Sequence, residues 1–459
     1  MTRTVVRGAR WPADVAIRDG WIEAVGAIPP EDGDIVVDAA GGIVTAGLVN
    51  THHHLYQWLT RGRAVGSDLF GWLTELYPVW AHLDAEDVHA AALVGLGELA
   101  VSGCTTAADH HYVVPGGDDA VFDALADAAT QVGIRLHLAR GSMDLGESDG
   151  GLPPDHLVED RDTILISTAA VADRWHDGEL IVVTVAPCSP FSVTPELMTE
   201  SAEFARSRGL RLHTHLAETI EEQYDCIDRF GCRPVEYADE LGWIDGDVWL
   251  AHGIHLDDGE VARLGAAGTG VAHCPSSNAR LGAGACRVTD LVAAGAPVGL
   301  GVDGPASNEV GGLFAELRQA LYTARQRTGR AADMLPPEAL RLATEGGADC
   351  LGRPDLGRLT PGHRADLAIW PAADLDDIAD PVDALVLGPV RRARTVLVGG
   401  VTVVEDGRLT GLDLEAAHRE LARRAHRLWP DGGEPPTTTP TTPTAADPAE
   451  LAGTTGKDA

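Results

Sequence analysis

Three consecutive histidines follow an apolar run near the start of the chain. The run covers residues 43–50 and is typical of a buried strand. Because alternate residues of a strand share a face, His52 and His54 can point at one ion while His53 points away. Neutral imidazole is a common metal ligand, so this pair is a candidate for one side of a metal site.

Three more apolar runs end in side chains with the same chemistry. These side chains are His213, His215 and Glu218 after the first run, His252 after the second, and Asp303 after the third. In a parallel barrel the C-terminal ends of the strands meet on one face, where the active site lies. Three imidazoles and one carboxylate on that face suit Zn²⁺ or another borderline divalent metal, which would bring the pKa of a bound water towards ~7.

The elements that must position these residues alternate along the middle of the chain. The expected strands cover residues 135–139, 181–186, 211–216, 248–251, 270–273 and 298–302. Between them lie helical stretches, two of which are capped by Asp84 and by Thr194, the latter followed by a proline. Strands separated by helices predict a parallel sheet, and residues 49–354 are enough to close it into an eight-stranded barrel.

Both ends of the chain have a different pattern. Residues 1 to about 45 alternate short β-prone runs with turn signals. The same pattern returns late in the chain, in residues 365–370, 384–387, 394–398 and 401–404. We therefore expect residues 1–48 and 355–412 to build one β domain beside the barrel.

Two segments fit neither pattern. Residues 141–178 are acidic and contain Gly and Pro, and we expect them to form a loop over the site. Residues 430–459 are rich in Pro, Thr and Ala and are predicted to be a disordered tail. Hydrophobic residues make up 44% of the chain, so the remainder can bury a sizeable core.

Charge and lysine content exclude several classes of function. The chain has 69 acidic and 35 basic residues and a net charge of −34, so nucleic acids and anionic membranes are poor partners. Its only lysine is Lys457, which leaves the folded part without a lysine for a Schiff base, for pyridoxal phosphate or for a P-loop. The N-terminus has no signal-peptide run, so we expect a cytoplasmic protein.

Five motifs, in this order, resemble the amidohydrolase superfamily in its purine and triazine deaminase branch. They are residues 47–54 (GLVNTHHH), 213–218 (HTHLAE), 251–253 (AHG), 273–278 (HCPSSN) and 301–308 (GVDGPASN). The resemblance covers roughly residues 1–410 and implies an α/β fold, a distorted (β/α)₈ TIM barrel flanked by a small β-sandwich built from both termini. It also implies a homo-oligomer.

The resemblance implies a role for each residue of the site. The implied ligands of the metal are His52, His54, His215 and Asp303. Members with two metals usually bridge them with a carbamylated lysine, and the barrel of this chain has no lysine, so a single ion is expected. Zn²⁺ is the expected ion, and Fe²⁺ or Mn²⁺ suit the same donors. His252 and Asp303 would orient and deprotonate the attacking water. Glu218 would donate a proton to the ring nitrogen beside the attacked carbon.

Three shorter motifs resemble the 8-oxoguanine deaminases of that branch. They are residues 54–57 (HLYQ), 109–112 (DHHY) and 186–191 (APCSPF), from which Gln57, Tyr112 and Cys188 are candidates for contact with the substrate. The leading reaction is conversion of 8-oxoguanine and water to urate and ammonia. Trp58 and Pro305 depart from the pattern, and we expect them to affect substrate fit.

Other activities remain open at this point. The alternative substrates are guanine, a pterin, or an s-triazine that loses an amino or chloro substituent to the same hydrolytic chemistry. A reading from a different class is an inactive barrel with a structural role. Such a protein would be expected to lack ligands, whereas this chain keeps all of them.

Overall fold

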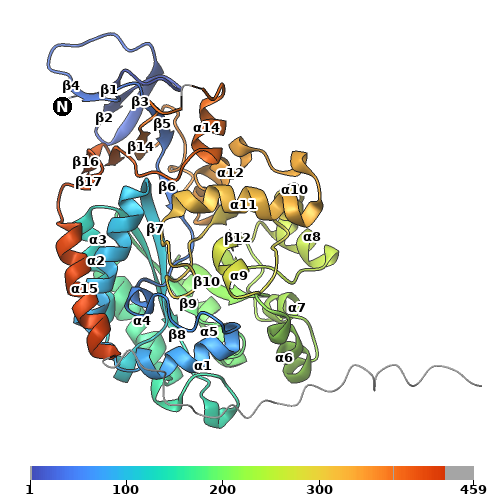
Figure 1. Ribbon diagram of the computed structural model, residues 1–459. Coiled ribbons are helices and arrows are strands. Elements are labelled where there is room, and N and C mark those ends of the chain that lie inside the picture. Colours follow the sequence, from blue (N-terminus) through green and yellow to red (C-terminus); the bar gives the residue numbers. More distant parts are fainter. Residues whose placement is uncertain (1–2, 376, 430–459) are drawn as a thin grey trace, which may run out of the picture.

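Eight parallel strands form a closed barrel at the centre of the computed structural model, which describes residues 3–375 and 377–429 (Figure 1). The strands follow one another around the ring in chain order, and the last pairs with the first through Leu300 and Asn50. They are β6 (Leu48–Asn50), β7 (Cys104–His111), β8 (Arg135–Ser142), β9 (Ile181–Pro187), β10 (Arg211–Leu216), β11 (Val248–His252), β12 (Gly270–His273) and β13 (Val298–Leu300). The predicted tail, residues 430–459, lies outside the described residues.

Two further sheets stand beside the barrel. The first, in the order β3-β2-β1-β4, contains β1 (Thr4–Arg7), β2 (Asp14–Arg18), β3 (Trp21–Gly26) and β4 (Ile35–Asp38). The second, in the order β17-β16-β15-β14-β5, contains β5 (Ile43–Ala46), β14 (Leu367–Trp370), β15 (Thr395–Val398), β16 (Val401–Glu405) and β17 (Arg408–Leu409). Side chains of both sheets, among them Val6, Ile17, Val44 and Leu367, are buried in one apolar cluster. The predicted barrel with a β-sandwich built from both termini is confirmed.

The barrel is accompanied by helices, most of which cover its outside (Figure 1). They are α1 (Leu69–Trp80), α2 (Ala85–Val101), α3 (Ala120–Val132), α4 (Arg161–Trp175), α5 (Pro195–Ser207), α6 (Ile220–Phe230), α7 (Pro234–Glu240), α8 (Asp258–Ala267), α9 (Pro275–Arg280), α10 (Val288–Ala294), α11 (Leu313–Thr328), α12 (Pro336–Leu342), α13 (Glu345–Cys350), α14 (Pro381–Leu387) and α15 (Leu414–Leu428). Both expected caps are present, with Asp84 and Thr194 accepting hydrogen bonds from the first turns of α2 and α5. No helix in the described part of the chain is long and apolar enough to cross a membrane.

Two elements differ from the sequence-based expectation. Residues 384–387 were expected as a strand but belong to α14, because Asp380 caps that helix and Pro381 occupies its first position. Strand β7 was not expected at all. Its sequence, CTTAADHH, has small and polar residues in place of the branched apolar residues that mark a buried strand.

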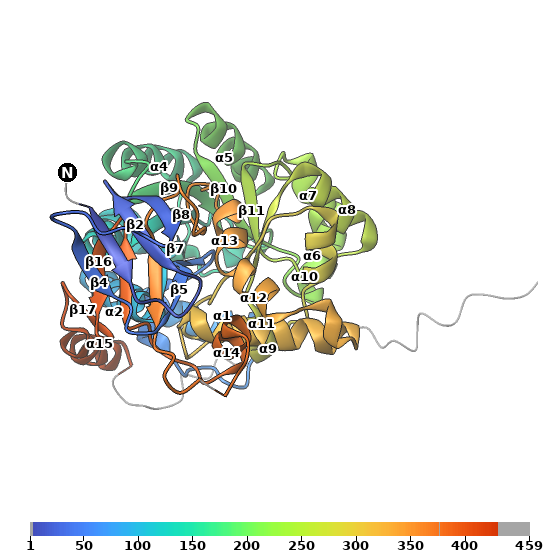
Figure 2. The same ribbon diagram turned by 90° about the horizontal axis from the view of Figure 1, so that it is seen from above.

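The interior of the barrel is closed at one end. Val49, Ala108, Trp249 and Ala272 point into it and pack against the small helix α13 and the residues that follow it. Figure 2 looks onto this end and shows α13 lying among the strands. Because α13 fills the N-terminal mouth, polar side chains at the opposite, C-terminal ends of the strands are left to form the site.

Candidate active site

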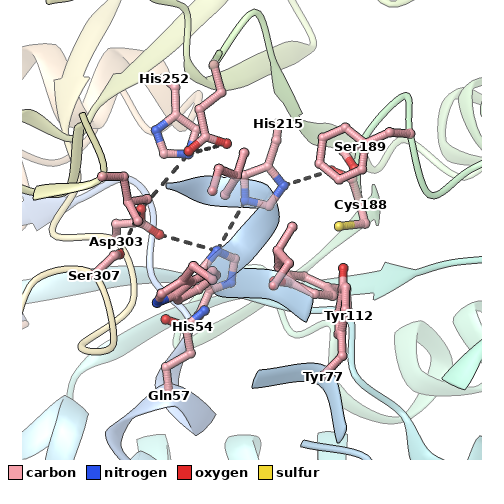
Figure 3. A pocket seen from close by; sticks show the side chains of 16 residues that line it. His54, Gln57, Tyr77, Tyr112, Cys188, Ser189, His215, His252, Asp303 and Ser307 are labelled. Carbon is pink, nitrogen blue, oxygen red and sulfur yellow. Dashed lines mark hydrogen bonds and ion pairs between the residues drawn. The ribbon is translucent and has the colours of Figure 1, made fainter. Parts of the chain in front are cut away.

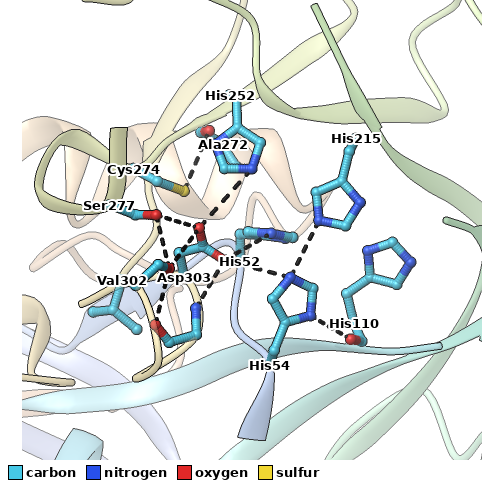
Figure 4. Close-up of polar contacts among 12 residues, drawn as sticks. His52, His54, His110, His215, His252, Ala272, Cys274, Ser277, Val302 and Asp303 are labelled. Carbon is cyan, nitrogen blue, oxygen red and sulfur yellow. Dashed lines mark hydrogen bonds and ion pairs between the residues drawn. The ribbon is translucent and has the colours of Figure 1, made fainter. Parts of the chain in front are cut away.

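Four of the predicted residues meet at the C-terminal end of the barrel with their ligand atoms facing one another (Figure 4). His52 and His54 follow β6, His215 lies near the end of β10, and Asp303 follows β13. Nε2 of His54 lies 3.1 Å from Nε2 of His215 and 3.3 Å from Oδ1 of Asp303. Nε2 of His52 is 3.5 Å from the same oxygen. Three imidazole nitrogens and a carboxylate oxygen gathered in a buried site fit a divalent cation.

The other ring nitrogens of these histidines are hydrogen-bonded outward. Nδ1 of His54 donates to the backbone oxygen of His110 at 2.6 Å, and Nδ1 of His215 donates to that of Cys188 at 2.7 Å. A carbonyl oxygen can only accept, so each Nδ1 carries the proton and each Nε2 presents a lone pair to the site. Burial lowers the pKa of both imidazoles well below its usual value, which keeps them neutral.

His52 is oriented by another histidine. Its Nδ1 lies 2.8 Å from Nε2 of His213, and Nδ1 of His213 lies 2.8 Å from the backbone oxygen of Trp249. The ring of His213 stacks on the Trp249 indole, with 4.4 Å between centroids. His213 was noted in the sequence as part of a cluster but was given no role. His213 lies two residues before His215 on β10, so it sits behind the site, where it supports the candidate ligand His52.

Asp303 is held by three hydrogen bonds. Its Oδ2 accepts from the hydroxyls of Ser277 at 2.6 Å and Ser307 at 3.3 Å, and its Oδ1 accepts from the backbone N–H of Gly304 at 2.8 Å. Burial raises the pKa of the carboxyl, but the contacts with His52 and His252 outweigh it and leave the pKa well below the usual range. Asp303 also has a positive φ of 61°, a strained backbone that is typical of functional sites.

His252 and Glu218 form the opposite wall of the same site. Nε2 of His252 lies 3.6 Å from Oε2 of Glu218 and 4.0 Å from Oδ2 of Asp303, while its Nδ1 donates to Oδ1 of Asn278 at 2.9 Å. Burial alone lowers the pKa of His252, but the two carboxylates raise it above its usual value. Burial raises the pKa of Glu218 to about 7. A carboxyl and an imidazole whose pKa values are both raised by their surroundings, and which face each other across a pocket, are suited to acid–base catalysis.

A small pocket leads to these side chains (Figure 3). Its free volume is about 30 Å³, room for roughly two water molecules. Besides the site residues, its walls are Leu69, Trp72, Leu73 and Tyr77 of α1, with Phe191, Ser189 and Leu281. No residue of 141–178 lines it, and the wall that covers the site comes from α1. That residues 141–178 form a loop over the site stays a prediction.

The three candidate substrate contacts all line this pocket. Gln57, Tyr112 and Cys188 are each at most 3% exposed. The amide of Gln57 makes no hydrogen bond of good geometry within the described part of the chain. A Cβ on Gly304 would lie 1.7 Å from Oε1 of Gln57, so only glycine leaves room for that amide.

Trp58 and Pro305, which were expected to affect substrate fit, are not part of the pocket wall. The indole of Trp58 packs instead against two glycines, because a Cβ on Gly95 or on Gly311 would lie within 2.7 Å of its ring atoms. Its exposed fraction is only 3%, so it fills the core behind the site. The tryptophan that lines the pocket is Trp72 of α1, and no sequence motif indicated it.

Comparison with known proteins agrees with this geometry. The sequence profile of the amidohydrolase family matches residues 43–403. The chain is 49% identical to an 8-oxoguanine deaminase of Pseudomonas aeruginosa, over 92% of this chain and 99% of that protein. It is 35% identical to an isoxanthopterin deaminase from an unknown prokaryotic organism, over 90% of this chain and 91% of that protein.

A solved structure is also similar. The crystal structure of atrazine chlorohydrolase from Arthrobacter aurescens TC1, complexed with zinc, superposes with a TM-score of 0.86 at 31% identity, covering 92% of this chain and all of that one. The relatives are therefore hydrolases and deaminases, and the histidine cluster found here has the chemistry that binds zinc. With the family profile matched along most of its length and a relative at 49% identity, this chain belongs to the amidohydrolase family.

Proposed function

We propose that the protein is a metal-dependent hydrolytic deaminase of a fused-ring aromatic amine, with 8-oxoguanine as its substrate and urate and ammonia as its products. The observation that carries this proposal is the convergence of three bare Nε2 atoms on Asp303, opposite the Glu218–His252 pair. The similarity to an 8-oxoguanine deaminase over nearly the full length of both proteins supports this choice of ring.

His52, His54, His215 and Asp303 would hold one divalent cation, Zn²⁺ by preference, with Fe²⁺ or Mn²⁺ compatible with the same donors. When bound, the ion lowers the pKa of a coordinated water so that hydroxide is available at neutral pH. The protein's own contribution is to keep the three imidazoles neutral and correctly turned, and to hold the Asp303 carboxylate in place with three hydrogen bonds.

The acid–base steps follow from the positions of three side chains. His252 and Asp303, 4.0 Å apart, are placed to orient the attacking water and accept its first proton. Glu218 faces the pocket with a pKa of about 7, so it holds a proton that it can donate to the ring nitrogen beside the attacked carbon. Asp303 then passes a proton to the departing amine, and the second proton of the water restores Glu218. General acid–base steps of this kind are worth about 10²–10⁴-fold each.

The substrate ring would lie between the Glu218–His252 pair and α1. Gln57 brings an amide with an unused donor and an unused acceptor to this space, and such a group suits the mixed donor–acceptor edge of an oxidised purine. Tyr112 and Cys188 complete the contact at the other side of the pocket (Figure 3). Because the free volume is only about 30 Å³, the side chains of α1 must shift to admit a bicyclic ring.

The experiment that tests the proposal is ammonia release by zinc-loaded protein. 8-Oxoguanine, guanine, isoxanthopterin and an amino-s-triazine are compared side by side, with Glu218→Gln as the inactive control. A clear preference for 8-oxoguanine supports the proposal. Release of ammonia from another ring alone would keep the metal chemistry and overturn the substrate. No ammonia from any of them, with zinc bound, would overturn deamination and lead to a test of chloride release from a chloro-s-triazine.

A further inference from the structure

A second cavity opens at the other end of the barrel, beside α13. Its volume is about 490 Å³, enough for a small organic molecule. Its walls come from the starts of the strands β8 to β10, from the ends of helices α4 and α5, and from the residues after α13. The wall residues that matter here are His137, Arg206, Arg211, Asp247, Gly352 and Arg353. The reaction proposed above uses none of them.

The cavity is basic, although the whole chain carries a net charge of −34. Three arginines line it, against a single carboxylate, Asp247. That carboxylate is already occupied, because Arg206 binds it with two hydrogen bonds of 2.8 and 3.0 Å. Arg353 is likewise paired, with Asp355 through bonds of 2.9 and 2.8 Å. The remaining arginine, Arg211, determines what the cavity can bind.

Arg211 forms no ion pair with any described residue. Its two terminal nitrogens donate to the backbone oxygens of Gly246 and Cys350, both at the long distance of 3.2 Å, and its Nε has no acceptor. Burial lowers the pKa of Arg211, yet a guanidinium remains charged at neutral pH. The nearby carboxylate of Asp247 acts on Arg211 but is hydrogen-bonded to Arg206, so this half-buried charge has no carboxylate of its own, and an anionic ligand would supply one.

His137 forms the inner wall and is also left without partners. It is only 1% exposed, and neither of its ring nitrogens makes a hydrogen bond with any residue that the structure describes. Burial, helped by the charges of Arg353 and Arg211, lowers its pKa to about 3, so the ring is neutral and offers one N–H donor. Buried polar groups in native proteins nearly always have a partner, and an anion in the cavity would supply the one that this imidazole lacks.

The guanidinium of Arg211 is held in a fixed place. Gly352 has a φ of +68°, and a Cβ there would lie 2.5 Å from Nη1 and 2.8 Å from Cζ of Arg211. On another side the guanidinium lies over the Trp249 indole, with 5.8 Å between Cζ of Arg211 and the centroid of the ring. Glycine at 352 therefore lets the guanidinium pack against the backbone, and its planar fork is oriented before any ligand arrives.

We propose that this cavity binds a small organic oxyanion, a carboxylate or phosphate monoester, through the guanidinium of Arg211 with His137 as a neutral donor. The oxyanion is part of a larger molecule, because 490 Å³ exceeds the space that a bare inorganic ion fills. The site is separate from the active site. Trp249 and His213, stacked on each other, lie between the two.

Isothermal titration calorimetry on zinc-loaded protein tests the proposal with three probes: succinate, ribose 5-phosphate and inorganic phosphate. The expected result is binding of succinate or ribose 5-phosphate, weakened at least about tenfold by Arg211→Gln, as the loss of a charge-assisted hydrogen bond requires. Whichever of the two binds identifies the oxyanion. The matched control is Arg208→Gln, a nearby arginine that pairs with Asp173 outside the cavity and whose loss leaves binding unchanged.

Two results would overturn the proposal. One is no binding of any probe at millimolar concentrations. The other is equal binding by the wild type and Arg211→Gln, which would show that Arg211 does not hold the anion. His137→Leu keeps the bulk of the ring and removes both nitrogens, so it provides the same comparison if Arg211→Gln does not fold.

Discussion

Nδ1 of His52 and Nε2 of His213 lie 2.8 Å apart, and this contact decides which nitrogen of His52 faces the site. The chain of reasoning starts at the backbone oxygen of Trp249, which can only accept a hydrogen bond and therefore places the proton of His213 on Nδ1. Nε2 of His213 is then bare and must accept from Nδ1 of His52. Nε2 of His52 is left with a free lone pair that faces the site, 3.5 Å from Oδ1 of Asp303.

We predict that His213→Phe weakens zinc binding about 10–100-fold, the usual effect of losing an outer partner of a ligating histidine. Phenylalanine preserves the stack on Trp249 but cannot accept the hydrogen bond from His52. Competition with a chromogenic chelator measures the affinity. His111→Phe is the matched control, because that buried histidine is the last residue of β7 and its ring makes no hydrogen bond within the described residues. Equal zinc affinity in the wild type and His213→Phe would remove His213 from this role.

A second prediction identifies which cluster of histidines holds the ion. His215→Ala is expected to abolish stable zinc binding, since it removes one of the three clustered Nε2 atoms that we propose as ligands. His110 stacks on His215 and belongs to a different group of three, with His52 and His213. His110→Ala is expected to retain zinc, as measured by metal content after gel filtration. The reverse result, with zinc retained by His215→Ala and lost by His110→Ala, would move the ion to the deeper group.

Glu218→Gln is expected to reduce turnover at least about 10²–10⁴-fold while zinc stays bound. Glutamine keeps the size of the side chain, but its amide has no acidic proton that can be transferred to the ring nitrogen. In the variant the metal content is measured beside kcat, which separates a catalytic loss from a lost ion. Glu222→Gln is not a suitable control. In the wild type the Glu222 carboxylate accepts hydrogen bonds from the backbone N–H groups of Ala217 and Glu218, so changing it would also disturb Glu218. Unchanged turnover in Glu218→Gln would exclude Glu218 as the proton donor.

The barrel and its polar end were predictable because they depend on patterns that recur along the chain. Residues 211–216 and 270–273 were expected as strands and match β10 and β12 residue for residue. His52, His54, His215, His252 and Asp303 stood at the ends of such runs, and a parallel barrel brings those ends together. Their assignment as metal ligands and catalytic residues, like the domain limits and the homo-oligomer, stays a prediction.

What could not be predicted depends on contacts across the barrel. The hydrogen bond between His52 and His213 joins residues 161 positions apart, and no motif at either position indicates the other as its partner. The pocket wall from α1 was missed for the same reason, because Trp72 and Tyr77 belong to an apolar helical face that looks like ordinary core. The helix at 381–387 was mistaken for a strand because its residues are apolar and branched, and its cap at Asp380 was overlooked.

The stability of the fold should fall as the pH rises, partly because of Asp109. Burial raises its pKa from 3.8 to about 7. Its Oδ1 accepts from the N–H of Leu55 at 2.6 Å, and its Oδ2 has no partner among residues 3–375 and 377–429. Between these two values the carboxyl is protonated when folded and ionised when unfolded, so unfolding releases a proton and stability decreases with rising pH. The full cost, reached above pH 7, is about 4 kcal/mol as an upper bound.

Asp109→Asn removes this pH dependence and preserves the acceptor for Leu55. We expect the urea midpoint of the variant to exceed that of the wild type at pH 8 and to differ less at pH 5. The exposed Asp149, changed to Asn, is the control and should shift the midpoint little at either pH. A variant no more stable than the wild type at pH 8 would show that ionisation of the Asp109 carboxyl does not destabilise the fold.

The last prediction concerns the substrate. Gln57→Leu is expected to lower kcat/KM for 8-oxoguanine about 10–100-fold, because leucine keeps the volume but loses the donor and acceptor that face the ring. The loss should be smaller for guanine, which lacks the additional oxo group, so the preference for 8-oxoguanine narrows. Trp58→Phe is the matched control one residue along the chain, since its indole packs behind the site. If both variants reduce kcat/KM equally for both purines, Gln57 supports the fold and does not recognise the ring.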